Sequence, residues 1–297
     1  MYAIAIYNNK GGVGKSTLTV FMADFLASLT VRGRPMRVVV LDLDPQGSCG
    51  AALLGQETLT RARASGATLG RLARELDLGR KAVDPDPFLF TRQKSVTQGR
   101  AKPVAELTVM ISDKTSAFAF EVNPLHRLTT LRERLRPELE KRFDIALLDL
   151  PGNIDPRNLL AVNGLIMSDS VITPVEVSRF SIDAMPDTVE MIRYARQQGD
   201  GQRPLFLGML LNRTDKRGQQ YQRNIPWIHE MAGRLEIPLF EQVLPNAQSL
   251  TAATDDALST GSLRERYGSY YPQVKAVVGE AFRRWQTLEA SQAANTG

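Results

Sequence analysis

A short apolar stretch at the start of the chain, Tyr2–Tyr7, leads directly into the glycine-rich segment NNKGGVGKST, Asn8 to Thr17. A strand, a glycine loop and a helix in this order bind phosphate, because the glycine backbone approaches phosphate oxygens and the helix N-terminus attracts their charge. The pattern for such loops, G-x-x-x-x-G-K-[ST], requires glycine where Asn9 stands and does not specify a second lysine, here Lys10. The stretch predicts an α/β nucleotide-binding fold with one unexplained lysine.

The loop also predicts which residues contact the nucleotide. Glycines allow close approach of the main chain, Lys15 reaches the β- and γ-phosphates, and the Ser16 hydroxyl is a ligand of Mg²⁺. The expected contacts are Gly11, Gly12, Val13, Gly14, Lys15, Ser16 and Thr17.

Short apolar runs alternate with longer amphipathic segments along nearly the whole chain. Strands are predicted at Tyr2–Tyr7, Arg37–Leu43, Leu107–Ile111, Asp144–Leu150, Ser170–Val175, Leu205–Leu211 and Leu239–Leu244. Helices are predicted at Lys15–Leu29, Thr68–Leu78, Leu125–Arg142, Arg157–Met167, Ser181–Gln198, Gly218–Leu235 and Tyr270–Leu288. This alternation predicts a doubly wound α/β fold, with a mainly parallel sheet covered by helices on both faces.

Carboxylates follow two of the predicted strands. Asp42 and Asp44 end VVVLDLDPQG, and their i, i+2 spacing predicts that both side chains point to one face of that strand. Asp149 ends IALLDLPG, before Pro151 and Gly152. Such carboxylates are often only helix caps, but together with the glycine loop they favour a magnesium–triphosphate site.

Composition sets limits on the class of protein. The chain has 297 residues and one cysteine, Cys49, which excludes an internal disulfide and a cluster held by cysteines of one chain. No apolar run approaches 18 residues, and no secretion signal is recognisable at the N-terminus. We expect a cytoplasmic protein with a single domain over residues 1–290 and a frayed tail, 291–297.

The net charge of +5 is concentrated in one segment. Between Arg61 and Lys102, ten lysines and arginines stand against four acidic residues. Within this basic excursion, about 61–103, the irregular stretch Pro85–Pro103 is either a two-strand excursion or a loop. A solvated basic face without a partner and a surface for a polyanion both remain open.

Three motifs carry a family resemblance. KGGVGKST, LDLDPQGS and IALLDLPG together resemble the ParA/MinD family of deviant Walker-type P-loop ATPases, over nearly the whole chain from Met1 to about Phe282. The DPQG form of the second motif is more similar to the ParA branch, the ATPases of plasmid and chromosome partition.

The resemblance implies a role for Lys10. In this family the extra lysine reaches the phosphates of the partner subunit in an ATP-sandwiched homodimer, where a cation supplied in trans neutralises charge during phosphoryl transfer. By the same resemblance, Asp44 orients the attacking water, Asp149 holds Mg²⁺ through water, and Asp42 supports this network. A slow basal rate and activation by a ParB-like partner protein are implied.

Recognition of the base is implied at Asn212, assisted by Pro245 and Asn246, with adenine as the expected base. NRTD, from Asn212 to Asp215, also resembles the N-K-x-D element that reads guanine. ATP is the expectation, and GTP remains the alternative.

DNA and membrane are the two surfaces to which ATP dimers of this family bind. The apolar stripe of the last predicted helix favours docking on the sheet over membrane insertion, because a polar tail follows it. Nonspecific double-stranded DNA is therefore the expected partner, bound through lysines and arginines. The candidate contacts are Arg217, Arg223, Arg264, Arg266, Lys275, Arg283 and Arg284.

These observations favour a nucleoid-associated Mg-ATP-dependent ATPase that partitions or positions DNA or a large cargo. The alternatives are a MinD-like membrane-associated ATPase, a metabolic P-loop ligase or kinase, and a regulatory DNA-binding module.

Overall fold

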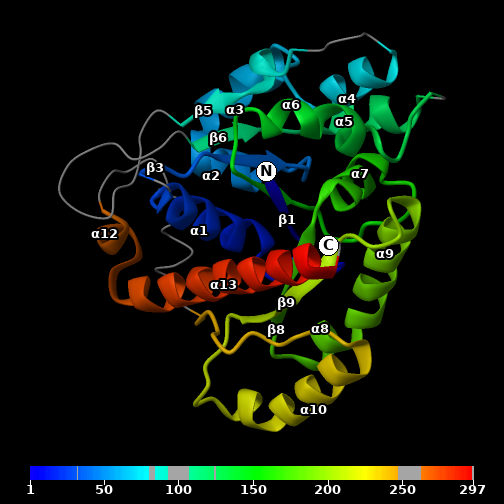
Figure 1. The fold of residues 1–297 in the computed structure, drawn as a ribbon. Helices are drawn as coiled ribbons and strands as arrows, with labels where there is room; N and C mark the ends of the chain where they lie inside the picture. Colours follow the sequence, from blue (N-terminus) through cyan, green and yellow to red (C-terminus); the bar gives the residue numbers. More distant parts are fainter. Residues whose placement is uncertain (32, 80–83, 93–106, 124, 247–261, 296–297) are drawn as a thin grey trace.

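The apolar runs of the sequence form the central strands of one sheet. A computed structural model describes residues 1–31, 33–79, 84–92, 107–123, 125–246 and 262–295 (Figure 1). In these residues the strand order is β5-β6-β4-β7-β1-β8-β9, all parallel except β5 against β6. The strands are β1 (Tyr2–Ile6), β4 (Val38–Asp42), β5 (Phe90–Thr91), β6 (Leu107–Met110), β7 (Ile145–Asp149), β8 (Ser170–Glu176) and β9 (Leu205–Asn212), with a separate pair β2 (Thr30–Val31) and β3 (Arg34–Pro35).

Helices cover both faces of this sheet, as expected for a doubly wound fold. Alternation along β1 sends Tyr2, Ile4 and Ile6 into one apolar core and Ala3 and Ala5 into the other. The first core lies under α1 (Lys15–Ala27), α2 (Ser48–Leu54), α3 (Gln56–Ala64), α12 (Leu263–Tyr267) and α13 (Tyr271–Asn295). The second lies under α4 (Leu69–Asp77), α5 (Lys114–Glu121), the π-helical turn Leu131–Leu135 with α6 (Arg136–Glu140), α7 (Leu159–Met167) and α9 (Met185–Gln198). The predicted fold class is confirmed.

A third apolar cluster packs α8 (Arg179–Asp183) and α10 (Gln219–Leu235) beside β8 and β9. Two short 3₁₀ turns, Asp86–Phe88 and Gly268–Tyr270, complete the helical segments of the described residues.

Several predicted elements differ from the structure. The segment Leu239–Leu244 is not a ladder strand and forms only an isolated parallel bridge between Met209 and Leu239. The helix predicted over Leu125–Arg142 is shorter, because helical structure begins at Leu131. Residues 291–295, expected to be frayed, continue α13 as far as Asn295.

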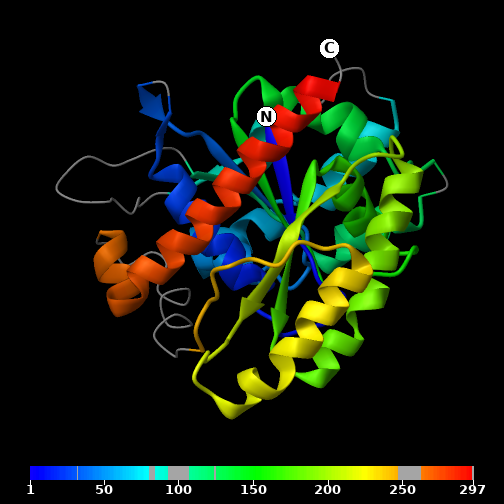
Figure 2. The same cartoon turned by 60° about the horizontal axis from the view of Figure 1, so that its bottom comes forward.

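The stripe of the last helix is buried on the sheet, as predicted. Val274, Val277 and Val278 lie in the first core, and Trp285 stacks against Tyr2 with ring centroids 5.0 Å apart. Figure 2 shows α13 lying diagonally across this side of the sheet, with α12 at its N-terminal end. No helix of the described residues is long and apolar enough to span a membrane.

The outer edge of β9 is covered along most of its length. A bulge at Leu207 gives Gly208 a φ of +152° and turns the Leu207 carbonyl toward Arg284 Nη1, at 3.1 Å. Farther along, Phe240 N donates to Met209 O and Leu244 N donates to Leu211 O, both at 2.9 Å.

The basic excursion is only partly described. Residues 80–83 and 93–106 lie outside the described part of the chain. Phe90 and Thr91 form β5, which fits the start of the two-strand excursion, and Phe88 is buried. Arg92 is also buried and pairs with Asp24 of α1 at 2.5 Å, so this arginine of the basic segment is structural.

Candidate functional site

The glycine loop joins β1 to α1 at the carboxyl edge of the sheet. Gly12 and Gly14 have φ values of +80° and +86°, which residues with side chains rarely adopt. A Cβ at Gly14 would lie 2.2 Å from the side-chain nitrogen of Asn212. The loop thus closes against the end of β9, with its main chain open to a ligand at Gly11 and Gly12, where a Cβ would meet nothing within 4 Å.

Lys15 lies beneath this loop. Its side chain is almost fully buried, and the amine donates to the carbonyl of Lys10 at 2.9 Å. Burial lowers the pKa of Lys15, while the nearby charges of Asp149 and Asp44 oppose that shift. The amine is therefore held next to the carboxylates and can exchange a main-chain acceptor for a phosphate oxygen.

Asp42 and Asp149 end neighbouring strands and are paired in register. Both are completely buried. Asp42 accepts from Gly50 N at 2.6 Å, and Asp149 accepts from the Thr19 hydroxyl at 3.1 Å. One oxygen of each carboxylate has no hydrogen-bond partner.

Burial raises the pKa of both groups, and the charge of Asp149 raises that of Asp42 further. Two buried carboxylates with free oxygens fit a divalent cation, because a cation removes the penalty of holding both ionised. With the Ser16 hydroxyl, this donor set of oxygens suits Mg²⁺. No group of three or more acidic, histidine or cysteine side chains among the described residues is arranged for a metal, so the candidate Mg²⁺ site depends on two carboxylates and a hydroxyl.

Asp44 lies beyond the strand, in the turn Asp44–Gly47, where Gly47 N donates to its carbonyl at 2.9 Å. Asp44 is not part of the predicted strand, because β4 ends at Asp42. Its charge nevertheless raises the pKa of Asp42, so the two carboxylates lie near each other. The Asp44 carboxylate is half-buried and accepts from Gln46 N at 2.9 Å. It stands at the edge of the site, where water can reach it.

The loop after β7 packs directly on the glycine loop. A Cβ at Gly152 would lie 3.0 Å from Gly11 N and 3.1 Å from the Lys10 carbonyl carbon. Asn153 N donates to Asn9 O at 2.7 Å. The two loops therefore contact each other through main chain, so that a shift of one is felt by the other.

Lys10 takes a different direction from Lys15. Its amine donates to the Ser181 hydroxyl of α8 at 2.9 Å, and the Ser178 hydroxyl donates to Ser181 at 2.9 Å. Lys10 is half-buried. Within one chain, the Lys10 amine is thus bonded to α8, whereas the Lys15 amine lies near the carboxylates of Asp149 and Asp44.

The residues expected to bind the base lie together. Asn212 is buried and donates to the Val13 carbonyl at 2.8 Å. Thr214 N donates to Leu244 O at 2.9 Å, which fixes Pro245 beside the end of β9. Asn246 and Asp215 line a cavity of about 420 Å³ at this position. Asn212 and Pro245 are not among the residues that line this cavity.

Comparison with known proteins adds to this geometry. A family model described as an AAA domain matches residues 1–202. The chain belongs to the ParA/MinD family of P-loop ATPases.

Named relatives within the family are partition proteins. The chromosome partitioning protein ParA of Myxococcus xanthus is 27% identical over 245 residues, 82% of this chain and 74% of that protein. Apo McdA from Cyanothece superposes with a TM-score of 0.73 at 18% identity, covering 95% of this chain and 99% of that one. Cobyrinic acid a,c-diamide synthase from Mycobacterium smegmatis superposes with 0.68 at 21% identity, covering 96% and 95%. These structural likenesses show the fold alone.

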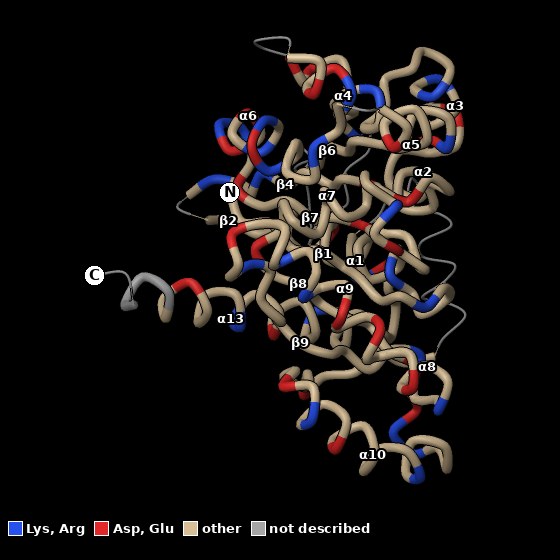
Figure 3. Tube along the Cα trace, turned by 90° about the vertical axis from the view of Figure 1, so that its right-hand side faces the viewer, with Lys and Arg blue, Asp and Glu red and all other residues tan. Residues whose placement is uncertain are grey.

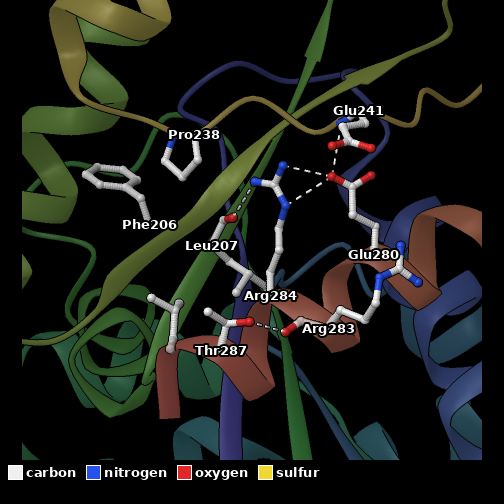
Figure 4. A pocket seen from close by; sticks show the side chains of 9 residues that line it. Phe206, Leu207, Pro238, Glu241, Glu280, Arg283, Arg284 and Thr287 are labelled. Atoms are coloured by element: carbon white, nitrogen blue, oxygen red, sulfur yellow. Dashed lines mark hydrogen bonds and ion pairs between the residues drawn. The ribbon is translucent and has the colours of Figure 1, made fainter. Parts of the chain in front are cut away.

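Two of the seven DNA-binding candidates are structural residues in this member of the ParA/MinD family. The Arg266 side chain is 3% exposed and pairs with Asp24 at 3.2 Å. Figure 4 shows the Arg284 guanidinium beside Glu280 and Leu207. It donates to Glu280 at 3.0 Å and to the Leu239 carbonyl at 2.6 Å. The prediction for Arg266 is wrong, because its side chain is buried, whereas Arg284 is partly exposed and its guanidinium is engaged by Glu280 and by two carbonyls.

The other five candidates are exposed: Arg217, Arg223, Arg264, Lys275 and Arg283. They come from different elements, and Figure 3 shows basic residues interspersed with acidic ones, as in α6 and α10. Arg264 also stacks on Tyr271, 5.3 Å from the ring centroid. The structure leaves these five available for contact with a polyanion.

Sequence reasoning missed three side chains that touch the site. Thr19 holds Asp149, Ser181 holds Lys10, and Thr188 accepts from Asn9 N at 3.0 Å. Thr19 stands one helical turn after Lys15, so the spacing along the helix could have predicted that its side chain lies next to the loop. Ser181 and Thr188 lie far along the chain, and only the fold brings them to the loop.

Proposed function

We propose that this chain is a partition-type ATPase that dimerises around Mg-ATP, binds double-stranded DNA nonspecifically as the ATP dimer, and separates when ATP is hydrolysed. The observation that carries the proposal is the presence of two lysines with different surroundings. Lys15 lies under the glycine loop, next to the carboxylates. Lys10 is bonded to α8 and, once released from Ser181, has a side chain long enough to serve a neighbouring molecule.

Each residue has a separate task in hydrolysis, which transfers the γ-phosphoryl group of ATP to water. Lys15 and the main chain of the glycine loop hold the phosphates, and Asp44 accepts a hydrogen bond from the attacking water. Ser16 and Asp149, supported by Asp42, would hold Mg²⁺, which neutralises phosphate charge when bound. The partner subunit's copy of Lys10 supplies the remaining positive charge.

Slow turnover follows from this division of tasks. The site of one subunit lacks the second lysine until another subunit arrives, and Asp44 stands half-buried at the edge of the site. A ParB-like partner protein that closes the dimer around the attacking water would accelerate hydrolysis and release DNA. Localisation on the nucleoid follows if the exposed cations Arg217, Arg223, Arg264, Lys275 and Arg283 contact DNA phosphates.

Two alternatives have less support. A membrane-bound role would use the last helix, but its apolar residues Val274, Val277 and Val278 are buried on the sheet. A metabolic ligase of the same fold is suggested only by structural likeness to the diamide synthase at 21% identity. Such an enzyme turns over without dimerising around ATP, so the oligomeric state separates it from a partition ATPase.

The deciding experiment measures mass and DNA binding under matched conditions. Light scattering and binding to a 60-base-pair duplex are recorded with ATP, with ADP and without nucleotide, each at 50 and 200 mM salt. We expect a dimer and DNA binding with ATP only, and a steep loss of DNA affinity at higher salt. A monomer with ATP, or equal DNA binding with ADP, contradicts the proposal.

A further inference from the structure

The face formed by α4 and α5 is distinct from the nucleotide site and from the exposed DNA-binding candidates. These two helices cross at close range (Figure 1). A Cβ at Gly70 would lie 2.4 Å from the Ser116 carbonyl carbon, so no side chain can separate them there. The Thr68 hydroxyl donates to Ser116 at 2.8 Å, across the same junction. The face is therefore a rigid surface on which side chains of both helices are held.

A cavity of about 340 Å³ opens beside this crossing. Three arginines line it, Arg63, Arg71 and Arg74, against one acidic residue, Asp113. The Asp113 carboxylate is already occupied, since it caps α5 by accepting from Ser116 N at 2.9 Å. The cavity therefore has an excess of positive charge.

The three arginines are not equally committed to the fold. Arg74 is exposed and its guanidinium has no hydrogen-bond partner among the described residues. Arg71 is 53% exposed; its Nε donates to Glu75 at 2.9 Å, one turn along the helix, and its Nη1 donates to the Ser65 carbonyl at 3.3 Å. Arg63 is fixed by two carbonyls, those of Ser112 and Pro45. Arg74 is thus available to a ligand, and Arg71 can bind one by exchanging its solvent-exposed pair with Glu75.

Exposed apolar side chains lie on or just after the two helices that form the cavity, although none of them lines it. Phe118 of α5 is 64% exposed, and Val122, the residue after α5, is 59% exposed. Leu125 follows at 57%, and Leu78, the residue after α4, is 50% exposed. Four large apolar side chains so close in sequence to one cavity are unusual for a surface without a partner.

The combination identifies the kind of partner. Nucleic acid fits the arginines but not the exposed apolar side chains of this face, because phosphates and sugars do not cover Phe118 and Val122. Residues 93–106 of the chain do not complement the cavity in charge, since they carry Lys94, Arg100 and Lys102 against Glu106. An acidic peptide with apolar side chains satisfies both features.

We propose that the α4–α5 face docks an acidic, partly apolar segment of a partner protein. Carboxylates of the segment pair with Arg71 and Arg74, and its apolar side chains cover Phe118, Val122, Leu125 and Leu78. This surface goes beyond the proposed ATPase function, because docking needs neither ATP nor a dimer.

The α4–α5 face is also connected to the candidate nucleotide site through Arg63. The inference drawn from this connection rests on the proposed function. Arg63 Nη2 donates to the Pro45 carbonyl at 2.9 Å, and Pro45 directly follows Asp44. A Cβ at Gly47 would lie 2.3 Å from Arg63 Nη2, so this guanidinium packs tightly on the Asp44–Gly47 turn. A segment that displaces Arg63 shifts the turn that carries Asp44 and changes the rate of hydrolysis.

A random 16-residue peptide library, displayed on phage and selected on the full chain without nucleotide, tests the docking surface. We expect enriched peptides to combine aspartate or glutamate with apolar residues. The double variant Arg71→Glu/Arg74→Glu and the variant Phe118→Ser should each weaken the best peptide at least tenfold. The matched control Arg193→Glu/Arg234→Glu makes the same charge change on α9 and α10, at exposed positions, and should bind like the parent.

Docking of an acidic segment would be overturned by enriched peptides without acidic residues or by equal peptide binding of the parent and the double variant. It would also be overturned if the double variant lost binding to a DNA duplex but kept binding to the peptide. A nucleotide-free dimer broken by Phe118→Ser would also overturn it, since the occupant would then be a second copy.

The route through Arg63 is tested by the ATPase rate with and without the best peptide. The peptide should change the parental rate severalfold but leave Arg63→Lys unchanged, because lysine keeps the charge in the cavity and loses the paired bonds to Ser112 and Pro45. An unchanged parental rate refutes the route. Separate measurement of ATP affinity and basal turnover shows whether the ATPase proposal itself fails, since peptide binding is recorded without nucleotide.

Discussion

The amine of Lys10 and the hydroxyl of Ser181 are hydrogen-bonded at 2.9 Å within one chain. In the proposed function, Lys15 binds the phosphates of its own subunit and Lys10 does not. Its release must accompany the arrival of a second subunit if it acts in trans. The bond therefore marks a position that Lys10 occupies before dimerisation.

Lys10→Ala should abolish the ATP-dependent dimer while leaving nucleotide binding by the monomer within a fewfold of the parent. The loss of a cation that stabilises transition-state charge should lower turnover by about 100-fold. Light scattering with ATP and titration with a fluorescent ATP analogue check both expectations. A variant that still dimerises refutes the role in trans.

Asp44→Ala should trap the ATP dimer. Removal of the group that orients the attacking water should lower turnover by about 100-fold or more, because general-base assistance contributes roughly that much. Dimer and DNA binding should persist after ATP addition for longer than in the parent. Hydrolysis at the parental rate would show that another group orients the water.

Arg283→Ala and Arg284→Ala are a matched pair of variants at adjacent arginines, and we expect them to affect different properties. Arg284→Ala removes the donor to the Leu207 and Leu239 carbonyls and to Glu280, and should lower the free energy of unfolding by about 2–3 kcal/mol. Arg283→Ala should leave unfolding unchanged. If Arg283 contacts phosphate, its loss should reduce the salt dependence of DNA binding by about 1 in log–log slope.

Urea unfolding measures the first effect, and DNA titrations at several salt concentrations measure the second. Equal stability of both variants would contradict the structural role assigned to Arg284.

Asp144→Asn should destabilise the chain at neutral pH and much less in acid. The Arg34 guanidinium, with a smaller contribution from Arg37, holds the pKa of Asp144 well below its usual range, against the effect of partial burial. As the pH falls below about 4, the unfolded chain takes up this proton before the folded chain does, so the stability that Asp144 contributes is present above that pH and is lost below it.

The expected difference in unfolding free energy between parent and variant is about 1 kcal/mol at pH 7, because both arginines are partly exposed. Denaturant unfolding from pH 7 to pH 3 checks the trend. A difference in unfolding free energy between parent and variant that grows toward pH 3 would show that it does not come from the ionised Asp144 carboxylate.

Much of the sheet was predictable because its central strands are apolar on both faces, as in VVVL of β4. The seventh predicted strand, Leu239–Leu244, carries Glu241 and Gln242 at its centre and joins β9 through scattered main-chain hydrogen bonds. Helices α3 and α5 each bury two residues, too few for a visible apolar face, whereas α4, also of nine residues, buries five and was predicted. Spacing along the chain does not reveal α3 and α5.

In the site, motifs placed Lys15, Asp42, Asp149 and Asn212, because local sequence fixes the loop and the strand ends. Local sequence does not show whether an arginine side chain is exposed or engaged within the fold. Arg266 and Arg284 stand next to or near the exposed Arg264 and Arg283 in the sequence. Only the structure shows that Arg266 pairs with Asp24 and that Arg284 bonds to Glu280 and to the bulge of β9.

The covered edge of β9 limits how copies of this chain can associate. An open strand edge is a template on which extended segments of neighbouring molecules can add. Here the outward carbonyl of Leu207 is taken by Arg284, and Met209 and Leu211 are bonded to residues 238–244. Neighbouring copies of this chain therefore cannot add a strand to the sheet at that edge.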